Sequence, residues 1–150
     1  MTGIRDFMTS GHKDCDEAFA RAETAVGGGD WEAAAAGFGT FHAAMAQHLA
    51  MEEVVLFPAF EDATGMSGGG PTEIMRMEHA RMRELFEEMR QAIGARDPEQ
   101  SLGLCETLLM LMQQHNAKEE SMLYPMLDRV LGAQAGALIG RCNAVDAQAA

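Results

Sequence analysis

The segment His48–Pro58, HLAMEEVVLFP, returns 67 residues later as His115–Pro125, HNAKEESMLYP. When residues 7–65 are aligned with residues 74–132 without a gap, 18 of 59 positions are identical, whereas composition alone would give roughly four. The identical pairs include His12 and His79, His48 and His115, Glu52 and Glu119, and Glu53 and Glu120. The sequence therefore predicts two related halves that each supply polar residues to one site.

Glycine and proline clusters divide the chain into lengths typical of helices. The breaks lie at 27–30, 64–71, 94–98 and Gly132. The segments between them are rich in Ala, Leu, Met, Glu and Arg, which favour helices, and poor in β-branched residues. We expect helices near 3–26, 31–62, 72–93 and 98–130, and a short fifth helix after Gly132. The fold class is therefore expected to be all-α. The short connections predict an antiparallel up-and-down four-helix bundle, and the repeated sequence predicts an internal two-fold repeat within it.

Individual residues mark where these helices begin and where they are disturbed. Asp30 and Asp97 can cap the second and fourth helices, and Pro98 suits a first helical position. Pro58 and Pro125 fall inside the second and fourth helices, where a proline ring clashes with the carbonyl four residues before it. We expect both helices to kink or loosen at these prolines and to be regular at the glutamates before them.

Composition limits the class of protein. The 150 residues suffice for a single domain, with a core bundle over 3–131 and a tail helix over 132–150. The net charge of −12 and the lack of a basic cluster argue against nucleic acid and anionic membranes as partners. No apolar run is long enough for a membrane span and no export signal is evident, so a cytoplasmic location is expected.

The spacing of the repeated residues brings their side chains to one helix face. Residues four apart in a helix point the same way, so His48 and Glu52 converge, as do His115 and Glu119. The first and third helices add His12 and His79. Burying these six polar groups without partners would cost several kcal/mol each, by a rough estimate. Metal ions are the simplest way to satisfy them together.

The kinds of ligand restrict the metals. Nitrogen and oxygen donors without thiolates suit iron, manganese or zinc, and the three cysteines are widely spaced and expected to be reduced and buried. A histidine pair for each ion, with Glu52 and Glu119 bridging, predicts a two-metal centre. Six protein ligands leave coordination positions open, and oxygen, peroxide or nitric oxide could react there.

Other polar residues have competing interpretations. Glu53 and Glu120 are expected to be either exposed to solvent or hydrogen-bond acceptors that orient a ligand imidazole, and direct metal ligation is the less favoured alternative. Asp16, four residues after His12, could orient that histidine. His42 is expected at the surface because it points roughly 120° away from His48.

The His-x3-Glu-Glu segments, each ending in Leu, an aromatic residue and Pro and each preceded by a lone histidine, resemble the hemerythrin-like cation-binding family over residues 4–131. The resemblance implies the antiparallel bundle and a non-haem di-iron centre. Oxygen carriers of the family have a second histidine on the third helix, but Met75 and Arg83 stand four residues before and after His79. Glu78, Asp16 or water are candidates for the missing bond, as are, less readily, Glu53, Glu120 or His42.

The resemblance implies a protein that binds or reacts with oxygen, hydrogen peroxide or nitric oxide, with an open choice of redox partner. The alternative is a protein that binds or senses iron or zinc without turnover. A purely structural bundle with buried histidines is the third interpretation, and the repeated ligand set disfavours it.

Overall fold

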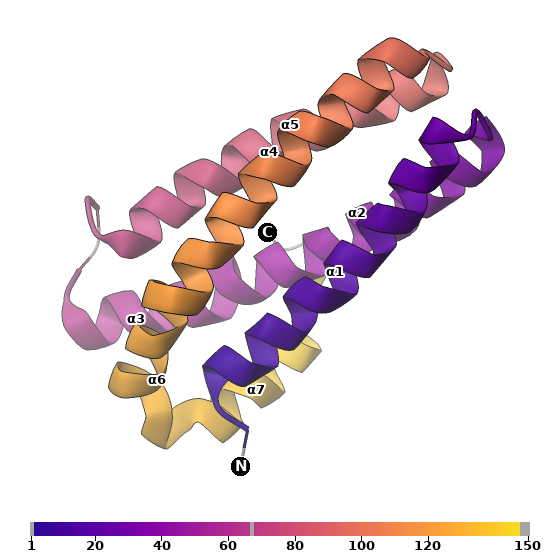
Figure 1. Cartoon of the computed structure of the whole chain (residues 1–150). Coiled ribbons are helices and arrows are strands. Elements are labelled where there is room, and N and C mark those ends of the chain that lie inside the picture. Colours follow the sequence, from indigo (N-terminus) through magenta and orange to yellow (C-terminus); the bar gives the residue numbers. More distant parts are fainter. Residues whose placement is uncertain (1, 67, 148–150) are drawn as a thin grey trace.

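The computed structural model describes residues 2–66 and 68–147. In that part of the chain the protein is all-α. Four long helices form an antiparallel bundle (Figure 1). They are α1 (Ile4–Gly27), α2 (Trp31–Ala50), α4 (Pro71–Gly94) and α5 (Pro98–Lys118). Helix α1 packs on α2 and α4 on α5, and contacts of α2 with α4 and of α1 with α5 join the two pairs. The predicted four-helix bundle is confirmed.

Two short helices extend α2 and α5 beyond their last regular turns. A π-helical segment, Met51–Leu56, leads from α2 into α3 (Phe57–Thr64), and a second, Glu119–Leu123, leads from α5 into α6 (Tyr124–Leu131). The chain then makes a 3-10 turn, Gly132–Gln134, and forms α7 (Ala135–Ala144). Helix α7 contacts the first π-helical segment and α1 (Figure 1). The predicted tail helix thus ends at Ala144, and residues 148–150 lie outside the described residues.

The predicted disturbance at the prolines is present, but it begins earlier than expected. The Phe57 N–H donates to the Glu52 carbonyl and the Tyr124 N–H to the Glu119 carbonyl, each five residues back. A widened π turn gives the proline ring room and changes the hydrogen-bond register just before it. The expectation that the glutamates lie in regular turns is therefore wrong, because the widening starts at the glutamates themselves.

The helix ends are capped both as predicted and by a contact that the sequence did not indicate. Asp30 and Asp97 accept from the backbone N–H groups of Ala33 and Gln100, both at 3.1 Å. The side chain of Asp128 in α6 accepts from the Ile4 N–H at 2.7 Å. This carboxylate also lies at the positive end of the α1 dipole. The link ties the N-terminus of α1 to the end of the bundle that holds α6.

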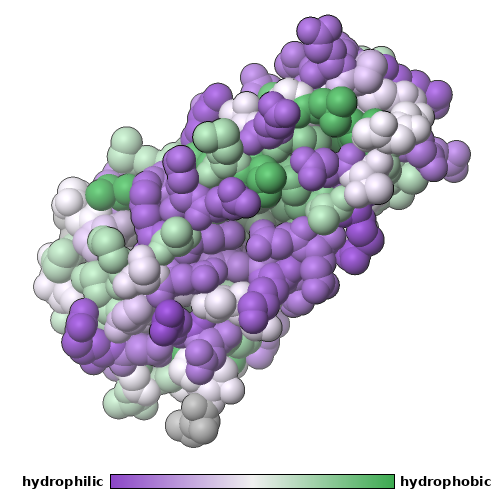
Figure 2. All heavy atoms as spheres, viewed as in Figure 1, coloured by the Kyte–Doolittle hydropathy of each residue, from purple (hydrophilic) through white to green (hydrophobic). Residues whose placement is uncertain are grey.

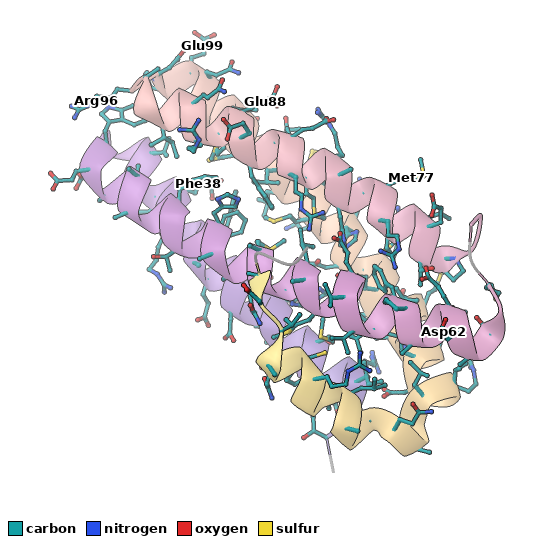
Figure 3. The ribbon with its side chains drawn as sticks, turned by 180° about the vertical axis from the view of Figure 1, so that it is seen from behind. Phe38, Asp62, Met77, Glu88, Arg96 and Glu99 are labelled. Carbon is teal, nitrogen blue, oxygen red and sulfur yellow. The ribbon has the colours of Figure 1, made fainter. Side chains whose placement is uncertain are left out.

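The apolar core consists of two clusters with a polar layer between them. One cluster includes Phe19, Phe41 and Phe86 and fills the end near the α1–α2 and α4–α5 turns. Figure 3 places Arg96 and Glu99 at that end. The other cluster includes Phe57 and Leu127 and is covered by α3, α6 and α7. Along each long helix the buried histidines and glutamates lie where one cluster gives way to the other.

The face of the molecule shown in Figure 2 carries mostly hydrophilic side chains, with apolar ones between them. Within the described residues, no helix is both long enough and apolar enough to cross a membrane. Cys15, Cys105 and Cys142 are free and buried, as the sequence predicted.

Candidate metal centre

The six residues singled out in the sequence come together in the polar layer of the bundle. His12 comes from α1, His48 from the end of α2, His79 from α4 and His115 from the end of α5. Glu52 and Glu119 are in the two π-helical segments. All six side chains are buried, and both carboxylates have no exposed surface. Each of the four helices of the bundle therefore contributes an imidazole to one point.

The six residues divide into two overlapping groups that could each hold a metal ion. Ligand atoms of Glu52, His79, His115 and Glu119 lie within 4.8 Å of one another, as do those of His12, His48 and Glu119. Glu119 belongs to both groups, which is the arrangement of a bridging carboxylate. Glu52 belongs to the first group only, and its Oε2 lies 3.8 Å from His48 Nε2.

The hydrogen bonding of the cluster fits a metal ion. The His79 Nε2, His115 Nε2, Glu52 Oε1 and Glu119 Oε2 atoms are buried and lack hydrogen-bond partners among the described residues. His79 Nε2 lies 3.1 Å from Glu52 Oε1, but not in a direction that forms a hydrogen bond. Buried polar groups are rarely left unsatisfied, because each one costs roughly 1–3 kcal/mol. Four such atoms facing one another make up a donor set suited to a cation.

Carboxylates hold the outer nitrogens of three of the four imidazoles. Nδ1 lies 2.6 Å from Glu120 in His12, 2.6 Å from Glu53 in His79 and 2.7 Å from Glu78 in His115. A carboxylate on Nδ1 fixes the tautomer and turns Nε2 towards a metal. Glu53 and Glu120 therefore occupy orienting positions, one of the roles that the sequence left open for them.

The structure also decides between other polar candidates. Glu78, a candidate for direct ligation, is on the outer nitrogen of His115 and pairs with Lys118. His12 Nδ1 contacts Glu120, and no hydrogen bond joins it to Asp16 among the described residues. His42 is exposed and stacks with Phe38 at a ring-centroid distance of 5.8 Å. Its predicted surface position is confirmed.

Charges around the cluster shift the pKa values of its members. Burial would raise the pKa of Glu53, but hydrogen bonds from His79 and Arg83 lower it to about 2. Burial would lower the pKa of His79, but Glu52 and Glu53 outweigh it and raise the pKa to about 9. His48 has the opposite balance, and burial lowers its pKa to about 4. Glu53 is therefore a firm anion on the outer nitrogen of His79.

Tyr124 is a member of the cluster that sequence reasoning missed. Its hydroxyl donates to Glu52 at 2.6 Å and lies 3.0 Å from Glu119. It also lies 3.1 Å from His12 Nε2 and 3.3 Å from His48 Nε2. Burial, together with the nearby carboxylates, raises the pKa of Tyr124 well above its usual value, so the phenol keeps its proton. The only signal in the sequence was that Tyr124 replaces Phe57 of the first half.

One known protein family matches this chain. A model of the hemerythrin HHE cation-binding domain matches residues 3–127. The chain belongs to the hemerythrin HHE cation-binding domain family. No curated protein matched the chain. Nor did any solved structure. The family and the buried histidine–glutamate group together define a domain able to bind metal ions.

Proposed function

We propose that this protein holds a non-haem di-iron centre and binds or reacts with a small oxidant, namely oxygen, hydrogen peroxide or nitric oxide. One observation carries the proposal: an imidazole from each of the four long helices and two carboxylates from the π-helical segments converge in the core, and four of their ligand atoms lack hydrogen-bond partners among the described residues. The choice of iron and the class of oxidant are inferred from the resemblance to the hemerythrin-like family. Membership of a cation-binding family supports the proposal.

The ligand groups suggest how two ions would be shared. His12 and His48 would hold one ion and His79 and His115 the other, with Glu119 bridging and Glu52 available to bridge. Six side chains leave coordination positions open to an exogenous molecule. Two such ions would supply electrons by passing between ferrous and ferric states.

The remaining residues of the site position and protect these ligands. Glu53, Glu78 and Glu120 hold three imidazoles in the orientation that metal binding requires. The apolar clusters on either side exclude bulk water and keep the site at low dielectric, where charge interactions are strong. The Tyr124 phenol holds a proton beside Glu52 and Glu119, and can donate a hydrogen bond to a bridging carboxylate.

Metal content per chain is the first test. Untagged protein, purified in air after growth without added metal, should contain two irons per chain by mass spectrometry. The isosteric variant Glu119→Gln should hold less than one iron, because it removes the carboxylate that both groups share. Glu84→Gln, at an exposed position of α4, is the matched control and should keep both. Equal iron in Glu119→Gln and the control would refute the assignment of the site.

Reaction with oxidants is tested separately. Reduced iron-loaded protein, mixed with oxygen, peroxide or nitric oxide in turn, should change its visible absorption with at least one of them. An iron-loaded protein that shows no spectral change with any of the three would remove the oxidant part of the proposal while leaving the metal site intact.

One observation favours a second candidate function, zinc or iron binding and sensing without turnover. The group formed by Glu52, His79, His115 and Glu119 already offers four ligands, which can close a tetrahedral zinc site. Zinc in the purified protein, with metal-dependent protease resistance and no redox reaction, would favour this candidate. Manganese is a third possibility for the same donors. The cytoplasmic location and the exclusion of nucleic acid and membranes stay predictions.

A further inference from the structure

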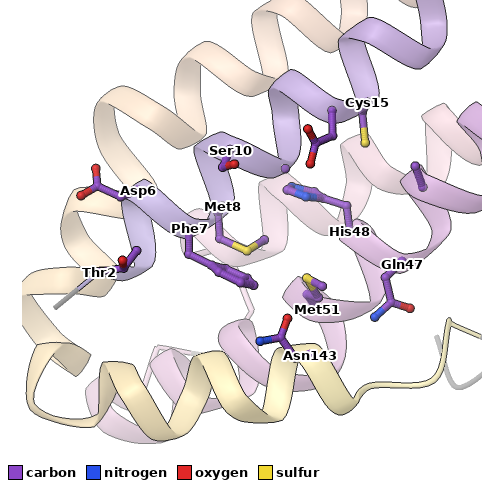
Figure 4. Close-up of a pocket in the computed structure, with 13 residues that line it drawn as sticks. Thr2, Asp6, Phe7, Met8, Ser10, Cys15, Gln47, His48, Met51 and Asn143 are labelled. Carbon is purple, nitrogen blue, oxygen red and sulfur yellow. The ribbon is translucent and has the colours of Figure 1, made fainter.

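A cavity of about 510 Å³ lies beside the metal centre, between α1, the end of α2 and α7. Figure 4 shows His48 on its wall, with Phe7 and Met8 on one side, Met51 on the other and Asn143 of α7 across from them. Apolar side chains supply much of the lining. The cavity therefore reaches the outer side of one imidazole of the metal centre.

His48 differs from the other three histidines of the site. The imidazoles of His12, His79 and His115 each have a carboxylate on Nδ1. Among the described residues, no group hydrogen-bonds to Nδ1 of His48, although the residue is only 6% exposed. Because the ring lines the cavity, this nitrogen is available to a molecule bound there.

The repeat explains why the cavity lies on this side. The residue of the first half that corresponds to Glu78 is Gly11, and the one that corresponds to Lys118 is Met51. Both replacements line the cavity, so a glycine and a methionine stand where the other half has an ion pair on its histidine. The corresponding cavity beside Lys118 and Met75 is only about 80 Å³.

Gly11 is required by a close approach. A Cβ atom at this position would lie 2.8 Å from His48 Nδ1 and 3.1 Å from Cε1, so no side chain fits without moving the imidazole. Glycine inside a helix is destabilising relative to alanine. The missing side chain at Gly11 leaves Nδ1 of His48 uncovered and makes room for an external hydrogen-bond acceptor.

We propose that this cavity binds a neutral organic molecule whose carbonyl-type oxygen accepts a hydrogen bond from the His48 Nδ1–H. The volume lies in the range of small-molecule sites, roughly 300–1,000 Å³, and far exceeds what one water needs. Asp6 and Asp14 also line the cavity and disfavour an anion. The inference rests on the proposed function, because a metal on Nε2 is what keeps the proton on Nδ1.

The test uses zinc-loaded protein, which is diamagnetic, and nitrogen-15 NMR of the histidine side chains. Acetophenone, a neutral ketone, is the probe, and α-methylstyrene, which has the same shape without the oxygen, is its control. Acetophenone should shift the His48 Nδ1 signal to saturation and leave His115 unchanged. α-Methylstyrene should bind roughly fivefold more weakly, because it lacks one hydrogen bond worth about 1 kcal/mol.

Two variants check where the probe binds without altering a ligand. Ala44 lines the cavity and Ala43 is exposed beside it on α2. Ala44→Leu should weaken acetophenone binding, and with it the shift at a given acetophenone concentration, by narrowing the cavity, whereas Ala43→Leu should leave the shift as it is. Equal affinity for both probes, or an unchanged shift in Ala44→Leu, would overturn the inference.

Zinc content, measured before the titration, separates the two proposals. Protein that takes up no zinc or iron would refute the metal centre itself. Protein that holds zinc but shows no His48 shift with acetophenone would refute the organic-molecule site alone.

Discussion

Replacement of Tyr124 by phenylalanine in the metal-free protein should destabilise the fold through loss of one hydroxyl. The phenol donates a single proton, and its shortest contact is 2.6 Å to Glu52. A hydrogen bond to a charged group contributes roughly 1.5–3 kcal/mol, so a loss of about 2 kcal/mol is expected. The ring itself should be tolerated, because Phe57 holds the corresponding position and stacks on His79 at 5.7 Å.

The assay is thermal and urea unfolding, followed by circular dichroism, of protein dialysed against a chelator. For a chain of this length, a loss of about 2 kcal/mol lowers Tm by roughly 4–8 °C. A double-mutant cycle with Glu52→Gln isolates the contact. The amide can still accept a neutral hydrogen bond, so the coupling energy should be about 1 kcal/mol rather than the full value.

Two results would refute this reasoning. A Tyr124→Phe variant as stable as the parent would mean that the hydroxyl contributes nothing in the metal-free state. A coupling energy indistinguishable from zero would mean that the hydroxyl acts through other neighbours, such as Glu119 at 3.0 Å.

Three further predictions concern affinity, protons and the backbone. Glu53→Gln should lower metal affinity roughly 10–100-fold, because the His79 imidazole loses the carboxylate that orients it. Competition with a chelating dye measures the affinity, and the exposed control Glu84→Gln should keep that of the parent. Equal affinities in the two variants would argue against the orienting role of Glu53. The stabilisation of the metal-free protein by protonated His79, whose pKa is raised to about 9, is complete below about pH 6.5 and lost as the pH rises through 9. Metal binding needs the neutral His79 ring, so metal uptake between pH 6.5 and 9 should release protons, and the metal affinity should rise with pH. Calorimetry in buffers of different ionisation enthalpy would detect the released protons. A metal affinity that does not depend on pH would contradict this prediction. Arg96 has φ 54°, a left-handed conformation that strains a residue with a side chain, and the corresponding residue of the first half is Gly29 at φ 71°. Arg96→Gly should therefore raise the free energy of unfolding in urea by about 1 kcal/mol. An unchanged free energy would show that the arginine side chain offsets the strain.

The helices were predictable because their signals are local. Segments expected near 3–26 and 72–93 are helices Ile4–Gly27 and Pro71–Gly94, and the aspartate caps at Asp30 and Asp97 were found three residues before their donors. Propensity, breakers and caps act over a few residues, so a single sequence contains them. The two prolines likewise indicated a local disturbance, although not the turn at which it starts.

The candidate site was predictable for a related reason. The period of the helix places His48 with Glu52 and His115 with Glu119 on common faces, and the repeat indicated that His12 and His79 play matching parts. The structure brings all six together. The sequence left solvated, orienting and directly ligating roles open for Glu53 and Glu120, because their partners His79 and His12 come from other helices.

The sequence by itself determined the helical class, the helix boundaries within a few residues and the six polar residues that meet in the core. These depend on spacing along one chain. The tertiary structure decided how the halves differ: Asp128 caps α1 from 124 residues away, Tyr124 reaches both glutamates, and Gly11 with Met51 leaves a cavity at His48. Such contacts depend on the distance and orientation of helices far apart in sequence, which packing fixes and local periodicity does not.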